Sequence, residues 1–222
     1  MRTKLKERML PDYTHGEEIF NMVSHIVGGG LGVVMLTLCI IRAALHGNVL
    51  GVVGAAIYGA TTILLYTMSS IYHGLHNGTA KKVFQVLDHC TIYLMIAGTY
   101  TAVAFGSVAK VSLLVCWGMF ALEWGLTALA VTLTAIDLKQ YNVFSMICYI
   151  VMGWAIILVY PVFVKAVGAI GAWLMFIGGV AYTIGAVLYG IGSKKRYMHS
   201  LFHLFVLIGS LLQFWSIFWY GL

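Results

Sequence analysis

Apolar residues form long runs along this chain, and polar residues gather in the short stretches between the runs. A helix needs about 20 apolar residues to cross the roughly 30 Å hydrocarbon core of a membrane. Seven runs reach that length, so the pattern predicts seven membrane-spanning helices. The runs are Phe20–Leu45, Val49–His73, Val83–Phe105, Val111–Leu133, Val143–Val164, Gly168–Gly190 and His199–Tyr220.

Short breaks containing glycine, asparagine or lysine separate the runs and leave no room for a second domain. We therefore predict an all-α membrane protein, with a cytoplasmic N-terminal segment, residues 1–18, followed by a seven-transmembrane helix bundle, residues 19–222. The predicted breaks are His46–Asn48, Gly74–Lys82, Gly106–Lys110, Thr134–Asn142, Lys165–Val167 and Ile191–Met198.

The composition agrees with this pattern. Hydrophobic residues make up 61% of the chain and charged residues 9%, and the mean hydropathy is +0.94. Soluble domains carry about 25% charged residues, so this chain has too few to cover a water-facing surface. A soluble enzyme, a disordered protein and a nucleic-acid binder are therefore excluded. The four cysteines all lie within apolar runs, which argues against a secreted disulfide framework.

Lysine and arginine lie mainly on one side of the predicted bundle. With the N-terminus inside the cell, ten of the thirteen face the cytoplasm, and the outer side keeps Arg42, Lys110 and Lys165. Cytoplasmic loops of membrane proteins carry an excess of these residues, so we predict the N-terminus inside and the C-terminus outside. The ten inner residues are Arg2, Lys4, Lys6, Arg8, Lys81, Lys82, Lys139, Lys194, Lys195 and Arg196.

Ionisable side chains inside membrane segments are costly and usually functional. In the predicted topology several of them fall at one depth, in the inner leaflet. His73 ends the second run, Asp88 lies about 7.5 Å into the third at 1.5 Å per residue, and His199 and His203 open the seventh. His25 lies near the inner start of the first run. Random placement would not be expected to produce this agreement.

His199 and His203 are four residues apart, so both imidazoles project from one face of a helix. His73 comes from another helix at the same depth. Three imidazoles on Zn²⁺ leave a fourth position open, as in catalytic zinc sites, although imidazole also suits copper, iron and nickel. Asp88 is the carboxylate predicted nearby, and it could accept a proton from an attacking water. Ser69, one turn before His73, could orient a ligand or a substrate carbonyl.

Simpler interpretations exist for some of these residues. A histidine pair with this spacing is also typical of solvated side chains near a membrane interface, and His46 and His76 fit ordinary loop positions. His89 should face about 100° away from its neighbour Asp88 on a helix, so we do not expect it to share the site. The sequence assigns no role to Glu123.

Short motifs, in order along the runs, resemble the hemolysin III family, the bacterial branch of the progestin and adiponectin receptor (PAQR) proteins. The resemblance extends over nearly the whole chain. The motifs are Glu17–His25 (EEIFNMVSH), Ser69–His73 (SSIYH), Asp88–Tyr93 (DHCTIY), Ala97–Thr101 (AGTYT), Met152–Trp154 (MGW), Gly178–Tyr182 (GGVAY) and His199–His203 (HSLFH).

The resemblance implies a seven-helix membrane fold with a zinc ion near the cytoplasmic side, held by His73, His199 and His203. It also implies that Asp88 is the family's water-binding aspartate and that Ser69 is the serine one turn before the first ligand. The wider superfamily includes alkaline ceramidases, which hydrolyse lipid amides, and bacterial members have been linked to membrane homeostasis. We therefore expect a protein of the bacterial inner membrane whose partners are membrane lipids rather than nucleic acid.

Several functions fit these residues. We expect a zinc-dependent intramembrane hydrolase of lipid amides or esters, in which Asp88 is the general base and Ser69 assists it. The alternatives are a non-enzymatic sensor or receptor-like regulator with structural zinc, and a cytolytic pore. An ion transporter fits less well, because the outer halves of the helices carry few ionisable groups. The sequence indicates neither the substrate nor the oligomeric state.

Overall fold

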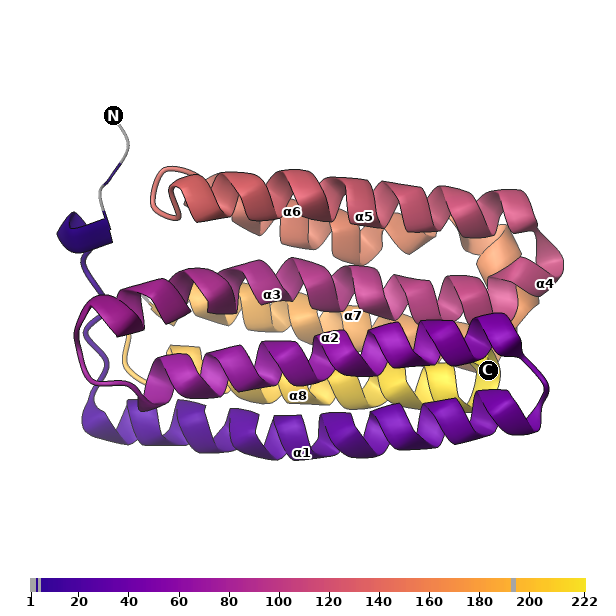
Figure 1. Ribbon diagram of the computed structural model, residues 1–222, viewed down its shortest axis with the longest axis horizontal. Helices are drawn as coiled ribbons and strands as arrows, with labels where there is room; N and C mark the ends of the chain where they lie inside the picture. The colour runs from indigo at the N-terminus through magenta and orange to yellow at the C-terminus, as the bar shows by residue number, and fades with distance from the viewer. Residues whose placement is uncertain (1–2, 4, 193–194) are drawn as a thin grey trace.

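In the computed structural model, the described part of the chain, residues 3, 5–192 and 195–222, is built from helices and contains no strand. The long helices lie side by side in an elongated bundle (Figure 1). The α-helices are α1 (His15–Leu45), α2 (Val49–Gly74), α3 (Thr79–Val103), α4 (Ala109–Val111), α5 (Leu113–Ile136), α6 (Asn142–Trp154), α7 (Tyr160–Gly192) and α8 (Met198–Ser216). Two 3-10 segments, η1 (Leu5–Glu7) and η3 (Ala155–Val159), and two π-helical segments, η2 (Ala104–Val108) and η4 (Ile217–Gly221), complete the elements.

Within the described residues, six helical stretches are long and apolar enough to cross a membrane. The predicted all-α class with membrane-spanning helices is confirmed. There are six such stretches rather than seven because the fifth and sixth apolar runs belong to one continuous stretch, Asn142–Gly192, of 51 residues. Of the basic residues used to predict the orientation, Arg2, Lys4 and Lys194 lie outside the described residues.

The 51-residue stretch is folded back on itself. Gly168 has φ 69° and ψ 172°, which is outside the helical region and at a positive φ that glycine adopts readily. The indole Nε1 of Trp154 donates a hydrogen bond to Thr183 Oγ1 at 3.0 Å, although the two residues are 29 positions apart. In a straight helix they would be about 44 Å apart. The part before Gly168 and the part after it are therefore the two arms of a hairpin.

The predicted break at Gly106–Lys110 is wrong. The helix continues from α3 through the π-turn η2 into α4, and the chain turns at Ser112, whose extended backbone has φ −156° and ψ 110°. Gly106 serves close packing instead of a turn, because a Cβ there would collide with the carbonyl of Gly221. Its own carbonyl accepts a hydrogen bond from Asn48 Nδ2 at 2.7 Å. A glycine that admits a neighbouring backbone looks the same in sequence as one that breaks a helix.

Helix α1 begins five residues before its apolar run because Thr14 and Glu17 form a capping box. Thr14 Oγ1 accepts the backbone N–H of Glu17 at 3.3 Å, and the Glu17 carboxylate accepts the backbone N–H of Thr14 at 2.8 Å. Glu17 and Glu18 are therefore held in the first turn of a regular helix, and their side chains point in different directions.

The ends of several helices gather at one end of the bundle. Figure 1 places the start of α1, the end of α2 and the start of α3 there, with the start of α8 beside them, and it places the C-terminus at the opposite end. Helix α2 packs between α1 and α3, and α8 packs against α7 and α1. This arrangement brings the end of α2 and the start of α8, far apart in sequence, to the same place.

Candidate metal centre

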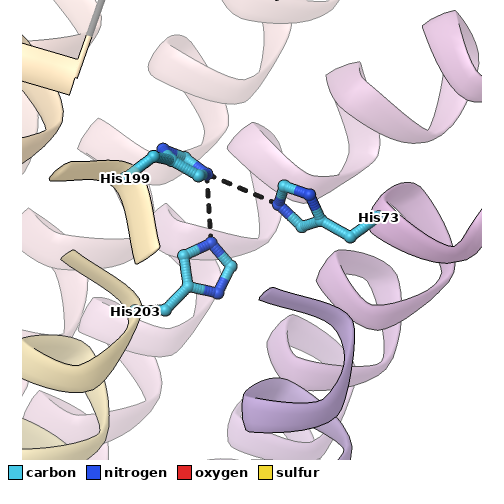
Figure 2. Close-up of side chains that lie close together, drawn as sticks. All are labelled: His73, His199 and His203. Carbon is cyan, nitrogen blue, oxygen red and sulfur yellow. Dashed lines mark hydrogen bonds between the residues drawn. The ribbon is translucent and has the colours of Figure 1, made fainter. Parts of the chain in front are cut away.

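Three buried histidines meet at this end of the bundle. His73 lies in the last turn of α2, and His199 and His203 lie in the first two turns of α8. The Nε2 atom of His199 is 3.4 Å from His73 Nε2 and 3.0 Å from His203 Nε2. Figure 2 shows the three rings turned toward one another. The i, i+4 spacing places two rings on one face of α8, and the packing of α2 beside α8 adds the third.

This cluster could hold a metal ion. Each histidine offers one ring nitrogen, and these nitrogens all lie within 4.8 Å of one another. The residues are only 3%, 6% and 1% exposed, so bulk water does not compete for their lone pairs. Neutral imidazole is the commonest protein ligand for metals such as zinc, and three of them leave a further coordination position free. The donor set therefore fits a transition metal.

Asp88 and Ser69 lie beside the cluster rather than within it. The Ser69 hydroxyl lies close enough to the Asp88 carboxylate to stabilise its charged form. Both residues line one cavity together with His199 and His203. Asp88 is thus a neighbour of the ligand set, in a position to act on a group bound in the cavity. Its chemical role and that of Ser69 stay predictions.

The cavity extends from the cluster into the bundle. It has a volume of about 120 Å³ and is bordered by α1, α2, α3, α6, α7 and α8. Tyr100, Trp154 and Gln213 border its far part, well away from the histidines in sequence and along the helices. Apolar side chains make up most of the remaining wall, among them Leu65, Ile92, Met95, Ile96, Phe202 and Val206.

His89 was not expected to share the site with Asp88, but it borders the same cavity. Its Nδ1 lies 2.8 Å from the Gln85 carbonyl and its Nε2 lies 3.1 Å from the Tyr189 hydroxyl. The carbonyl can only accept, so the proton sits on Nδ1 and Nε2 accepts from Tyr189. Two neighbouring side chains about 100° apart on a helix can both border a cavity that is wide enough.

The segment before α1 covers the cluster, a feature that the sequence did not predict. The ring of Tyr13 stacks on His199, with ring centroids 4.8 Å apart and an angle of 23° between the planes. Burial raises the pKa of the Tyr13 hydroxyl well above its usual value, and the nearby Tyr189 and Glu18 add to the effect. The hydroxyl therefore stays protonated near neutral pH. An aromatic residue in an N-terminal segment gives no signal in sequence that it will reach the site.

Glu18 was also missed as part of the site. Its Oε2 lies 2.7 Å from Nδ1 of His73, and its Oε1 lies 2.7 Å from Nζ of Lys81. The sequence placed Glu18 near the inner end of the first helix but did not predict its partners. The signals present were its place in the motif Glu17–His25 and its depth, since Glu18, His73 and Lys81 all lie near inner ends of predicted helices.

Two further buried groups have no hydrogen-bond partner among the described residues. The imidazole of His25 stacks on His203 at a centroid distance of 3.8 Å, and neither of its ring nitrogens is paired. Both carboxylate oxygens of Glu123 in α5 are likewise unpaired, and Glu123 is 1% exposed. His25 borders the cavity, whereas Glu123 does not.

Comparisons with known proteins identify the family. A sequence profile described as Haemolysin-III related matches residues 13–214. The chain belongs to this family. The hemolysin III resemblance read from the motifs is therefore confirmed, and the matched region contains every residue of the cluster.

Two hemolysin III relatives cover almost the whole chain. Hemolysin-3 of Bacillus cereus is 34% identical over 207 residues, which is 93% of this chain and 92% of the relative. The Hemolysin-3 homolog of Bacillus subtilis (strain 168) is 32% identical over 209 residues, which is 94% of this chain and 96% of the relative. No solved structure shows significant similarity to the chain.

Proposed function

We propose that this hemolysin III protein is a zinc-dependent intramembrane hydrolase of lipid amides or esters, acting in membrane homeostasis in the bacterial inner membrane. The observation that carries the proposal is the cavity, whose wall combines two of the three clustered histidines with Asp88 and Ser69. A ligand set that borders a cavity suits catalysis better than a closed structural site does, because a substrate can reach it. The largely apolar remainder of the wall suits a substrate drawn from the membrane.

The proposed topology has seven crossings, with the N-terminus inside. Each arm of the α6–α7 hairpin has about 25 residues, enough to cross roughly 30 Å of hydrocarbon. The opposite placement of the α1 start and the C-terminus in Figure 1 supports an odd number of crossings. A reporter enzyme that is active only outside the cytoplasm, fused after Leu222, should be active in cells. An inactive but fully expressed fusion would contradict seven crossings.

A bound zinc ion would supply Lewis acidity, polarising a substrate carbonyl and lowering the pKa of water. Asp88 is placed to accept the proton of an attacking water and to pass it to the leaving amine or alcohol. Ser69, which borders the same cavity, is placed to orient the Asp88 carboxylate. The apolar wall excludes bulk water and holds the hydrocarbon part of the substrate.

The test is an assay of the purified protein with zinc against a panel of ceramides, other acyl amides and acyl esters. Wild-type protein should cleave at least one class, and His203→Ala should abolish cleavage. Asp88→Asn should lower kcat about 10²- to 10⁴-fold, as expected for the loss of a general base, while metal content stays unchanged. His46→Ala, at an exposed loop position, is the matched control. No cleavage across the whole panel would count against a hydrolase.

A sensor or receptor-like regulator with structural zinc is the second candidate. The observation that favours it is that the cluster joins α2 to α8, so a bound metal would tie two helices that meet at one end of the bundle. Metal removal should then lower the thermal unfolding temperature while no lipid is turned over. A His73→Ala variant as stable as the wild type in the presence of zinc would contradict this function.

A cytolytic pore is the third candidate, and the names of the two Bacillus relatives favour it. Purified protein in liposomes should then release a trapped dye in proportion to its concentration. Absence of leakage at high protein-to-lipid ratios would reject the pore. The His203→Ala variant separates this function from hydrolysis, because a pore formed by the bundle does not require the cluster.

A further inference from the structure

We propose that Glu18 is a positioning residue of the metal centre, which holds His73 as the Nδ1–H tautomer and so directs its Nε2 lone pair at the other two histidines. This inference rests on the metal binding in the proposed function but not on hydrolysis. The proposal makes the first turn of α1, which supplies none of the three histidines, part of the metal centre.

The tautomer follows from the hydrogen bond. Oε2 of Glu18 lies 2.7 Å from Nδ1 of His73, and an ionised carboxylate can only accept hydrogen bonds. The proton of a neutral imidazole must then sit on Nδ1, which leaves Nε2 as a lone-pair donor. That Nε2 is the atom that faces His199 Nε2 at 3.4 Å. The hydrogen bond therefore prepares the nitrogen that faces the cluster.

Lys81 holds the carboxylate in place. Its Nζ lies 2.7 Å from Glu18 Oε1 and donates a second hydrogen bond to the Leu75 carbonyl at 2.9 Å. Lys81 is 2% exposed and the Glu18 side chain 18%, so water and salt screen this ion pair only in part. Each carboxylate oxygen thus has its own partner, and the Glu18 side chain has one preferred orientation. Carboxylates that contact the second nitrogen of a ligating histidine commonly raise metal affinity in this way.

The adjacent Glu17 bonds backbone groups rather than a histidine, so it offers a matched control. Its carboxylate caps α1 at Thr14 and accepts the backbone N–H of Tyr197 at the start of α8. It has the same charge and lies in the same helical turn as Glu18. Among the described residues, the Glu17 carboxylate forms no hydrogen bond or ion pair with a clustered histidine. General effects of lost charge or weakened α1 capping should therefore appear in Glu17 variants as well.

The alternative is that Glu18 only forms a salt bridge that stabilises the fold. His73 would then be a protonated imidazolium in the metal-free protein, with an N–H on Nε2 pointing at the other histidines. A salt bridge of this kind would oppose metal binding, because the proton would first have to leave. The two interpretations therefore predict different ring protonation and opposite effects on metal affinity.

The first measurement is zinc affinity of the full-length protein in detergent, by competition with a chromophoric chelator. Glu18→Gln keeps a hydrogen-bond acceptor but loses the charge, and we expect roughly a 10-fold weaker affinity; Glu18→Leu loses both, and we expect a loss approaching 100-fold. Glu17→Gln should stay within about 3-fold of the wild type, a margin that reflects ordinary variation between variants. Wild-type affinity in both Glu18 variants, or an equal loss in Glu17→Gln, would overturn the proposal.

The second measurement is the ¹⁵N NMR spectrum of histidine-labelled, metal-free protein, with the His73 signals assigned from a His73→Gln variant. Wild-type His73 should show a protonated Nδ1 and an unprotonated Nε2, and Glu18→Leu should lose this preference. An imidazolium or an Nε2–H tautomer in the wild type would overturn the proposal. This arm still decides the question if the protein binds no zinc, so failure of the metal site and failure of the Glu18 role are distinguishable.

Discussion

At the scale of single residues, buried polar groups divide into those with partners and those without. Beside the cluster, the Glu18 carboxylate is paired with His73 through one oxygen and with Lys81 through the other. Glu123 in α5 has no such partner among the described residues, although it is almost completely buried. A buried polar group without a partner costs about 1–3 kcal/mol of desolvation, so the two kinds of residue should respond to substitution in opposite ways.

Replacement of Glu123 by methionine, an apolar side chain of similar length, should stabilise the protein. We expect the free energy of unfolding to rise by about 1 kcal/mol or more, because the substitution removes an unpaired buried carboxyl group. Thr134→Val, on the same helix, is the control. Thr134 Oγ1 bonds Tyr93 at 3.2 Å and Ser145 at 3.1 Å, so its loss should destabilise. Denaturation in detergent measures both, and a destabilised Glu123→Met would contradict the unpaired state of this carboxyl group.

At the scale of elements, small residues decide how closely the helices around the site approach. Gly28 in α1 faces the ring of Tyr66 in α2 and the side chain of Leu207 in α8. Tyr66 is 1% exposed, and its hydroxyl is 2.6 Å from Ser210 Oγ, so the ring has little freedom to move. Close contacts at small residues are a common way to pack helices in membranes. Here they bring α1, and with it Glu18, next to the cluster.

Gly28→Ala should therefore destabilise the bundle. Its Cβ would lie 2.6 Å from Tyr66 Cδ1 and 2.9 Å from Leu207 Cδ2, and overpacking of this kind costs about 1–3 kcal/mol. Gly30→Ala, two residues further along α1, is the matched control, because nothing lies within 4 Å of its Cβ position. It should be neutral or stabilise by up to about 1 kcal/mol through helix propensity. Equal thermal unfolding temperatures for the two variants would contradict the packing described.

At the scale of the whole molecule, the N-terminal segment connects distant elements across one end of the bundle. Tyr13 stacks on His199, and Arg8 Nη2 donates to the carbonyl of Ile136 at the end of α5 at 3.3 Å. The backbone N–H of Thr3 donates to Asp137 Oδ2 at 2.6 Å. The segment thus spans from the metal centre to the turn between α5 and α6.

Acid should release the N-terminal end of this segment, where the Thr3 amide is bound to Asp137. The Thr3 amide, followed by the amides of Gln140 and Lys139, holds the pKa of Asp137 at about 2, below its usual value. Because the pKa is lower when the segment is attached, the interaction is fully present above about pH 4 and is lost as the pH falls toward 2. Asp137→Asn should release the segment already at pH 7.

The measurement is the fluorescence anisotropy of a dye on the N-terminal amine, which falls when the segment detaches. Wild-type protein should hold a high value from pH 7 to about pH 4 and lose it below that, while Asp137→Asn should start low. Glu7→Gln, an exposed residue on the same segment, should behave as the wild type does. Identical curves for wild type and Asp137→Asn would show that Asp137 does not anchor the segment.

The sequence by itself determined the class of the protein and the depth of its ionisable groups. Run length decides whether a helix can cross a membrane, and a rise of 1.5 Å per residue places His73, Asp88, His199 and His203 at similar depths. These are local quantities, so they need no knowledge of neighbouring helices. The i, i+4 spacing of His199 and His203 likewise places both rings on one face of a helix, whatever helices pack around it.

Only the tertiary structure decided which side chains meet. Rotation of each helix about its axis, and the rotamers of its side chains, depend on packing against other helices. For that reason the convergence of three Nε2 atoms, the reach of Glu18 to His73 and the cover of Tyr13 over His199 could not be read from spacing. The same holds for Gly106 and Gly168, one of which admits a neighbouring backbone while the other folds a helix back on itself. A local sequence pattern sets the depth of a residue and the helix face on which it lies. Which side chains touch depends on how all the helices of the bundle pack together.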